Sequence, residues 1–336
     1  MKKLISVALS LILALSCVSI AFAAEPYDSF GAYEHVFIIG VDGLGAAFEK
    51  VDSPNFDRIF ADNAYRHDAH TEVVTVSAQN WGSILTGVDY TTHGFDNGWC
   101  AENERGSDSG NNTIFYYARK AFPDAELVSF NNWSAINHGI IENDINVKKI
   151  NRSTDPLVVD AILRYLERGG RPELMFVQLD SVDHAAHTYG GFSKQYYNAA
   201  EKADVWLGEI YDAIEAKGLM KNSLFILVAD HGETENGHGG QTKEESSAIL
   251  AVAGHSVNAT VLNENVHNRD VSAIALYALG IEQPAHFISS VPPELFGESR
   301  EKTVAPNPMP LALRGFRNLL YVFVRMVNLL VGLFDK

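Results

Sequence analysis

The sequence predicts an α/β protein with a mostly parallel central sheet that is covered by helices on both faces. Four near-continuous apolar runs indicate buried strands, at 35–41, 174–179, 224–229 and 248–252. Segments with helical periodicity lie between or beside them, near 53–63, 79–87, 155–168, 193–217 and 269–279. Strands that are apolar throughout and alternate with helices are typical of parallel sheets buried on both faces. Such a sheet places its binding groups at the carboxyl ends of its strands.

The composition favours one large folded domain, which we expect over residues 24–300. Hydrophobic residues make up 46% of the chain and can supply a large core. Cys100 is the one cysteine outside the first 23 residues, so no disulfide is expected within the mature chain. The formal net charge of −16 argues against binding of a nucleic-acid polymer, which needs a basic face. A small anionic substrate is not excluded, because bound metal ions reverse the local field.

Residues 1–23 have the layout of a secretory signal peptide. Lys2 and Lys3 precede an apolar run that ends in Ala-Phe-Ala, with cleavage expected before Ala24. An uncleaved N-terminal anchor is the alternative, whereas Cys17 fits a lipoprotein site poorly. The sequence therefore predicts an exported protein that is secreted, periplasmic or at the cell surface.

Residues 301–310 are expected to form a linker, and residues 311–336 an amphipathic helix. On a helical wheel, Arg314, Arg317 and Arg325 fall with other polar residues within an arc of about 100°, and apolar residues fill the rest. This pattern favours a helix lying in a membrane surface. A transmembrane span would place Arg325 near its middle, at a cost of about 2.5–3.5 kcal/mol. Docking on the chain's own domain or on a dimer partner is the other alternative, and the oligomeric state stays open.

Metal-ligating side chains recur where the predicted strands end. Asp42, Asp180 and Asp230 each follow one of the apolar runs. Three histidines accompany them, namely His184, His231 and His238. Oxygen and nitrogen donors without thiolates suit zinc, with manganese as a competitor. The sequence therefore predicts a centre for two divalent cations.

Ser77 follows an apolar stretch and opens a predicted helix. A serine at this position could be a helix cap, a nucleophile or both. The sequence shows no histidine beside it to act as a base, so a metal ion is the expected activator. Thr75, two residues earlier, is the competing nucleophile. A nucleophilic hydroxyl beside two metal ions points to phosphoryl-group hydrolysis.

These motifs together resemble the alkaline phosphatase superfamily, most closely its nucleotide pyrophosphatase/phosphodiesterase branch. The motifs that carry the resemblance are Asp42-Gly43, Ser77 with Asn80, Thr86-Gly87, Asp180 with His184, Asp230-His231 and His238. The resemblance spans about residues 35–285 and implies an alkaline-phosphatase-like fold. It also implies that Asp180, His184 and His238 hold one zinc ion, and that Asp42, Asp230, His231 and Ser77 hold the other. Asn80 would donate its amide to a phosphate oxygen.

The departures from that pattern bear on the substrate. Ser77 stands where the diesterase branch usually has threonine, and serine is the choice of alkaline phosphatases. Met175, however, occupies the position of a third-metal carboxylate, and Trp81 and its neighbours supply no arginine clamp. The expected function is therefore cleavage of phosphodiester or pyrophosphate bonds in a small substrate, through a phosphoseryl intermediate. A phosphomonoesterase with the same two ions is the nearest alternative. A non-catalytic, metal-stabilised binding protein is the alternative from another class.

Overall fold

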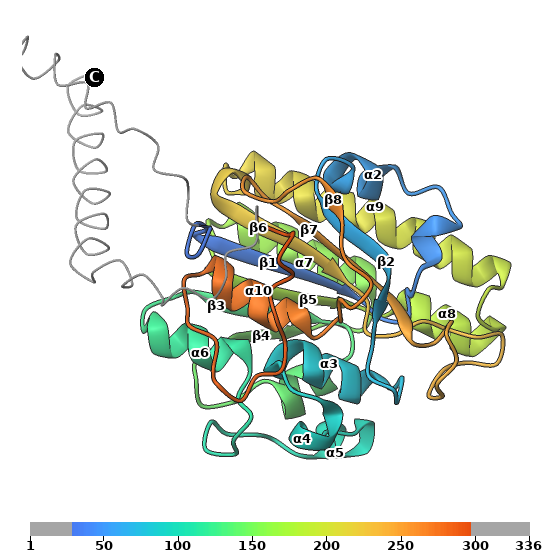
Figure 1. Cartoon of the computed structure of the whole chain (residues 1–336), viewed down its shortest axis with the longest axis horizontal. Coiled ribbons are helices and arrows are strands. Elements are labelled where there is room, and N and C mark those ends of the chain that lie inside the picture. The colour runs from blue at the N-terminus through green and yellow to red at the C-terminus, as the bar shows by residue number, and fades with distance from the viewer. Residues whose placement is uncertain (1–28, 297–336) are drawn as a thin grey trace, which may run out of the picture.

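The computed structural model describes residues 29–296, which form one eight-stranded sheet between two layers of helices (Figure 1). In chain order the strands are β1 (His35–Val41), β2 (Ala64–His70), β3 (Leu127–Asn131), β4 (Lys148–Asn151), β5 (Leu174–Leu179), β6 (Ser223–Val228), β7 (Ser247–Ala253) and β8 (Thr260–Val261). Across the sheet the order is β4-β3-β5-β1-β6-β7-β2-β8. The strands from β4 to β6 are parallel, whereas β7 is antiparallel to β6 and β2. The predicted, mostly parallel α/β fold is confirmed.

Alternation along β1 divides the apolar side chains into two cores. Every residue of this central strand is buried. Val36 and Ile38 face one core, and Phe37, Ile39 and Val41 face the other. Because successive side chains of a strand point to opposite faces, a continuous apolar run requires cover on both sides.

The helices provide that cover. The core around Phe37 is closed by α2 (Pro54–Phe60), α7 (Asp155–Glu167), α8 (Ser181–Tyr189) and α9 (Lys194–Ala216), together with the short helix η1 (Ala47–Glu49). The core around Val36 is closed by α3 (Ser77–Thr86), α5 (Asn97–Glu102), α6 (Ile114–Ala121), α10 (Asp270–Ala278) and the π-helical turn η2 (Ile136–Ile140). The remaining short helices are α4 (Tyr90–His93), beside α3, and η3 (Met220–Asn222), before β6.

Among the differences from the sequence-based expectation, two concern the strands β2 and β7. β2 was not predicted, because its sequence Ala-Tyr-Arg-His-Asp-Ala-His lacks an apolar run and is only partly buried between β7 and β8. The strand predicted at 248–252 is present as β7, but it runs antiparallel.

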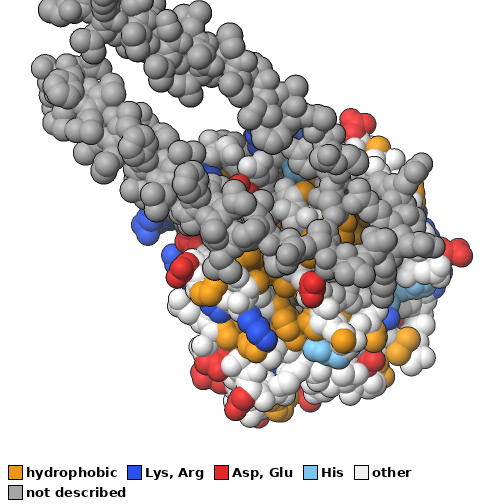
Figure 2. Space-filling view, turned by 60° about the vertical axis from the view of Figure 1, so that its left-hand side comes forward, with side chains coloured by type: hydrophobic (Ala, Val, Ile, Leu, Met, Phe, Trp, Pro, Cys, Tyr) orange, Lys and Arg blue, Asp and Glu red, His pale blue; other side chains and the backbone are white. Residues whose placement is uncertain are grey.

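The predicted signal peptide (1–23), linker (301–310) and tail helix (311–336) lie outside the described residues. Among residues 29–296, none of the helices combines the length and the apolar character that crossing a membrane requires. On the face visible in Figure 2, acidic and basic side chains are interspersed with hydrophobic ones.

A buried ion pair fixes the segment that follows α5. Arg105 Nη2 lies 3.7 Å from Glu142 Oε1, and both side chains are almost fully buried. Arg105 also donates to the carbonyls of Ile140 and Asn111, at 3.1 and 2.8 Å. Glu142 in turn accepts from the backbone and the hydroxyl of Thr113. This pair therefore joins the loop after α5 to the end of η2.

We expect Arg105→Leu to lower the free energy of unfolding by about 3–5 kcal/mol, because it leaves the Glu142 carboxylate buried without its cation. Urea unfolding followed by circular dichroism measures the change. Arg164→Leu is the matched control, since Arg164 pairs with Asp160 on the surface of α7 and its loss should cost about 1 kcal/mol or less. Equal effects of the two substitutions would contradict the structural role of Arg105.

Candidate metal centre and nucleophile

Three aspartates follow neighbouring parallel strands. Asp42 comes directly after β1, Asp180 directly after β5, and Asp230 two residues after β6. These strands are adjacent in the order β5-β1-β6, so their carboxyl ends meet at one edge of the sheet. Hydrogen bonds tie the ends together: the Asp42 N–H donates to the Leu179 carbonyl at 2.8 Å, and the Gly43 N–H donates to Asp230 Oδ1 at 3.1 Å. The structure thus brings these parts of the predicted site to one place.

One group of side chains, which we call the nucleophile cluster, consists of Asp42, Asp230, His231 and Ser77. His231 Nε2 lies 3.2 Å from Asp230 Oδ2, 3.5 Å from Asp42 Oδ1 and 3.5 Å from Ser77 Oγ. Ser77 is the first residue of α3 and is 8% exposed, and the other three side chains are more deeply buried. The hydroxyl therefore faces an imidazole nitrogen between two carboxylates.

The carboxylates of this cluster have free oxygens directed inward. Asp42 Oδ2 accepts from Trp81 Nε1 and from Gln178 Nε2, both at 2.9 Å. Asp42 Oδ1 and Asp230 Oδ2 are buried and have no hydrogen-bond partner among the described residues. Leaving such atoms unpaired is costly unless a cation binds them. Two carboxylate oxygens, an imidazole nitrogen and a hydroxyl are a suitable donor set for one divalent cation.

The pKa shifts in the nucleophile cluster agree with a binding site for one divalent cation. Burial raises the pKa of Asp42 well above its usual value, and the neighbouring carboxylates of Asp183 and Asp180 raise it further. Burial, followed by repulsion from Asp42, raises the pKa of Asp230 in the same way. Burial lowers the pKa of His231 to about 3, so this imidazole is neutral and able to bind a metal. Without a cation, the crowded carboxylates repel one another.

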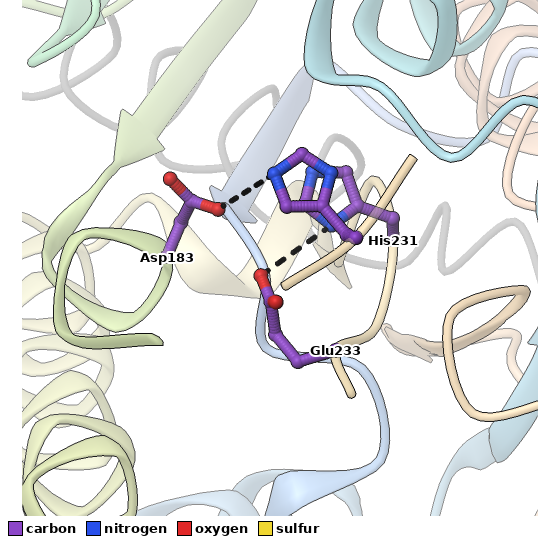
Figure 3. A group of neighbouring side chains, drawn as sticks. Asp183, His231 and Glu233 are labelled. Carbon is purple, nitrogen blue, oxygen red and sulfur yellow. Dashed lines mark ion pairs between the residues drawn. The ribbon is translucent and has the colours of Figure 1, made fainter. Parts of the chain in front are cut away.

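A second group, the histidine cluster, consists of Asp183, His187, His238 and Glu233. His238 Nε2 lies 3.3 Å from Asp183 Oδ1 and 3.0 Å from His187 Nε2, and His187 Nε2 lies 3.5 Å from Asp183 Oδ1. Figure 3 shows the carboxylates of Asp183 and Glu233 directed toward the imidazole groups. Ligand atoms of Asp183, His231, Glu233 and His238 all lie within 4.8 Å of one another.

His238 is oriented by the segment that precedes Ser77. Its Nδ1 atom is 2.5 Å from the Thr75 carbonyl oxygen, which can only accept, so Nδ1 carries the proton. Nε2 then faces Asp183. Burial lowers the pKa of His238, but the contact with Asp183, the hydrogen bond to the Thr75 carbonyl and the charge of Glu233 together raise it to about 9. Burial alone would raise the pKa of Asp183, but the contact with His238 and the nearby imidazoles lower it to about 2. Asp183 and His238 are thus a close pair within this cluster.

The structure places Asp180 and His184 outside the two clusters, whereas the expected metal set included both. Asp180 directly precedes α8, and its Oδ1 atom accepts from Gln178 Nε2 at 3.0 Å. His184 is exposed, and neither residue belongs to the two clusters. The pair that reaches His238 is Asp183 and His187, also four residues apart. Helix α8 begins so that its first turn lies against β1, where the Asp183 N–H donates to the Asp42 carbonyl at 3.1 Å. The sequence alone favours supporting or solvated roles for Asp183 and His187, and the structure places both in the histidine cluster.

Asn80 is also placed differently from the expectation. It is fully buried, and its amide donates to the carbonyls of Val74 and Val76 at 3.1 and 3.2 Å. Its Oδ1 atom accepts from the Glu72 N–H at 2.9 Å. An amide whose hydrogens are both used by the backbone has none left for a phosphate oxygen. Asn80 therefore shapes the turn before Ser77 and does not face the site.

Asn97, which the sequence analysis did not single out, contacts the start of the helix that Ser77 begins. Its Oδ1 atom accepts from the Ala78 N–H at 2.9 Å, at the start of α3. The side chain is exposed, and among residues 29–296 no hydrogen bond uses its Nδ2 group. Asn97 begins α5, capped by Asp96, whose side chain accepts from the Trp99 N–H. The available signal was the polar pair Asp96-Asn97 shortly after the nucleophile helix.

The two candidate nucleophiles differ in how their hydroxyls are used. Thr75 Oγ1 donates to the Gly240 carbonyl at 3.1 Å and accepts from the Gly239 N–H at 2.9 Å. It thereby holds the loop that carries His238. The Ser77 hydroxyl has only the 3.5 Å contact with His231, within the described part of the chain. Ser77 is thus the hydroxyl available for chemistry.

Comparisons with known proteins give a family and a set of similar folds. A family model described as type I phosphodiesterase / nucleotide pyrophosphatase matches residues 36–285. GPI ethanolamine phosphate transferase 1 of Emericella nidulans is 25% identical over 157 residues, covering 39% of this chain and 17% of that protein. The protein of the same name from Gibberella zeae is 26% identical over 156 residues, covering 39% and 16%. The chain thus matches less than a fifth of the length of these relatives.

Solved structures with similar folds include murine ectonucleotide pyrophosphatase / phosphodiesterase 5, in an inactive form with AMP. Its TM-score is 0.62 at 12% identity, over 75% of this chain and 96% of that one. The lipoteichoic acid synthase LtaP of Listeria monocytogenes has a TM-score of 0.56 at 14% identity, over 76% and 74%. A sulfatase of Bacteroides thetaiotaomicron has a TM-score of 0.61 at 13% identity, over 81% and 76%.

Proposed function

Because the chain belongs to the type I phosphodiesterase / nucleotide pyrophosphatase family, we propose that it is an exported, two-metal hydrolase of small phosphodiesters or pyrophosphates. The observation that carries this proposal is the position of Ser77. Its hydroxyl begins a helix and faces His231 Nε2 at 3.5 Å, beside the free oxygens of Asp42 and Asp230. A helix N-terminus also favours a bound phosphate.

The two clusters would hold one divalent cation each. Asp42, Asp230, His231 and Ser77 form the first set, as expected from the sequence. Asp183, His187 and His238 form the second, in place of Asp180 and His184. The donors are oxygen and nitrogen only, which suits zinc, with manganese as the competitor. When bound, the cations would favour the alkoxide form of the serine and neutralise charge on the phosphoryl oxygens.

The chain's own residues then account for a double displacement. Ser77 Oγ, having given up its proton, attacks phosphorus, and its P–O bond forms as the bond to the leaving alcohol or phosphate breaks. The product of this step is a phosphoserine that still carries the substrate's remaining group. Water then attacks the phosphoserine, which releases the phosphate product and restores Ser77. Asn97 is placed to donate from Nδ2 to a phosphoryl oxygen, because its Oδ1 atom is already fixed by the Ala78 N–H. An oriented donor that needs no reorganisation stabilises the crowded, charged transition state.

Asn97→Ala is expected to lower kcat/KM for an aryl phosphodiester by about 100-fold, the usual loss on removing one such donor. Asn97→Asp keeps the acceptor for the Ala78 N–H but cannot donate, so it should not restore activity. Steady-state kinetics of both variants provide the measurement. Asn103→Ala, at the exposed end of the same helix, is the control. Recovery of activity in Asn97→Asp would show that Asn97 only positions α3.

The proposal of a diester substrate depends on residues of the monoesterase pattern that this chain lacks. Met175, at the position of a third-metal carboxylate, is fully buried in β5 and packs in the core on the α9 side. We expect the protein, reconstituted with zinc or manganese, to hydrolyse an aryl phosphodiester at least about tenfold faster than the matching monoester, a difference of roughly 1.4 kcal/mol in barrier height. The reverse ratio would indicate a phosphomonoesterase. Metal binding without hydrolysis of either ester would indicate a binding protein.

A phosphotransferase is the second candidate function. The observation that favours it is the similarity to GPI ethanolamine phosphate transferase 1 over 39% of the chain. Transfer and hydrolysis share the first displacement on Ser77 and differ in whether an alcohol or water accepts the phosphoryl group. Phosphorus NMR of the products, with glycerol added as acceptor, separates the two. A glycerol phosphodiester as the main product would favour the transferase.

The place of action is proposed from the sequence. Residues 1–23 support export, and the amphipathic segment 311–336 supports attachment to a membrane surface; both lie outside the described residues. The proposed partner is a small phosphate ester, with no nucleic-acid polymer.

A further inference from the structure

Glu233 is a buried carboxylate that the expected metal set does not include. It follows His231 by two residues and is 1% exposed. Both of its carboxylate oxygens are shielded from solvent, and neither has a hydrogen-bond partner among the described residues. Its carboxylate points toward the imidazole groups (Figure 3). A carboxylate in such a place needs a cation or a set of donors, and the structure supplies no donors.

Glycines on two sides leave room for this side chain. A Cβ atom added at Gly43 would lie 2.9 Å from Glu233 Oε1 and 2.9 Å from the Asp183 Cα atom. A Cβ atom added at Gly191 would lie 2.9 Å from the Glu233 Cβ atom. Gly43 also has a φ of +65°, which disfavours other residues. The backbone therefore accommodates the Glu233 carboxylate closely, beside Asp183.

Support of His231 is the simpler role for Glu233, but the geometry does not favour it. Glu233 Oε1 lies 3.9 Å from His231 Nδ1, beyond hydrogen-bond distance. His231 Nδ1 instead lies 3.1 Å from the Gly232 carbonyl, which fixes the ring. The Glu233 oxygen does lie within 4.8 Å of ligand atoms of Asp183 and His238. Those distances suit atoms that surround a common cation.

We propose that Glu233 is a further protein ligand of the cation in the histidine cluster, alongside Asp183, His187 and His238. This inference depends on the proposed function, because that proposal supplies the cation. Its test, however, measures metal binding alone. Two carboxylates and two imidazoles would surround this ion, whereas Asp42, Asp230, His231 and Ser77 surround the other. Substitution of Glu233 would then weaken the binding of one ion and not of the other.

The test is Glu233→Gln, which keeps the shape and a hydrogen-bond acceptor but removes the negative charge. We expect one of the two ions to bind at least about tenfold more weakly, in line with losses on altering metal-site partners, while the other keeps its affinity. Competition with a chromophoric chelator and elemental analysis after dialysis measure both ions, with zinc as the probe. Glu235→Gln, exposed in the same loop, is the matched control.

Thermal unfolding provides a second test, because Glu233→Gln should affect the melting temperature differently with and without zinc. In the metal-free protein, Glu233→Gln replaces a buried carboxyl group that has no hydrogen-bond partner among the described residues, so the melting temperature should stay unchanged or rise. The rise in melting temperature on adding zinc should be smaller in Glu233→Gln than in the wild type. Glu233→Met, of similar length and without a charge, repeats the experiment if the glutamine variant folds poorly.

Several outcomes would overturn the proposal. Two ions bound with wild-type affinity in Glu233→Gln and Glu233→Met would show that Glu233 is not a ligand. Equal weakening of both ions, or a lower melting temperature without metal, would show a general structural role. A wild type that binds two zinc ions but cleaves no phosphoester would contradict the proposed function and leave this test intact.

Discussion

Ser77→Ala is expected to lower phosphodiester turnover by at least about 1000-fold while both metal ions remain bound. In the proposed mechanism the Ser77 hydroxyl attacks phosphorus, and the nucleophile cluster contains no second hydroxyl. Asp42, Asp230 and His231 would still supply three ligands to the ion beside it. Release of an aryl alcohol from the diester measures turnover, and elemental analysis of the same sample measures the metals.

Ser83→Ala is the control for this variant. Ser83 lies in the same helix and is fully buried, but its hydroxyl contacts His93 at 3.2 Å, away from the metal ligands. It should retain activity within a few-fold of the wild type. Wild-type-like hydrolysis by Ser77→Ala would falsify the assignment of the nucleophile and return attention to Thr75.

Asp183→Asn is expected to remove one of the two ions and to lower activity at least about 100-fold, whereas Asp180→Asn keeps both ions. The two variants make the same chemical change three residues apart. Asp183 Oδ1 faces His238 and His187, while Asp180 Oδ1 accepts a hydrogen bond from Gln178. Metal content after dialysis and the rate on an aryl phosphodiester are the two measurements.

The histidine pair provides an independent repeat of that comparison. His187→Ala should behave like Asp183→Asn, and His184→Ala should behave like the wild type, since His184 is exposed and outside the clusters. The opposite pattern, with ions lost from Asp180→Asn and His184→Ala, would restore the assignment made from the sequence.

The fold could be predicted largely because its central strands are buried on both faces. The runs that form β1, β5 and β6 are apolar throughout, and short runs of this kind are typical of strands at the centre of a parallel sheet. β2 could not be predicted in this way, because Arg66, His67 and Asp68 interrupt its apolar residues. Its strand conformation comes from pairing with β7, a contact between distant parts of the chain.

The grouping of the candidate residues could be predicted where position along a strand decides it, as for Asp42, Asp230 and His231, which the structure brings together. The grouping could not be predicted where it depends on which face of a helix is turned toward the sheet. The segment after β5 contains two aspartate–histidine pairs with similar spacing, and the second lies about 4.5 Å further along the helix axis. Only the packing of α8 against β1 selects between them. Distance along the chain was also a poor guide to which amide lies near Ser77. Asn80 is three residues from Ser77 but its amide bonds the backbone, whereas Asn97, much further along the chain, accepts a hydrogen bond from the Ala78 N–H.

Two contacts join the nucleophile cluster to the histidine cluster, and they bear on how the protein would bind its metal ions. The Asp183 N–H is bonded to the Asp42 carbonyl, and the rings of His231 and His238 stack with centroids 3.8 Å apart and planes at 17°. A shift of one half would therefore be transmitted to the other through these two contacts. The chain would present both sets of donors as one rigid frame, so each ion would enter a site that its neighbour need not organise.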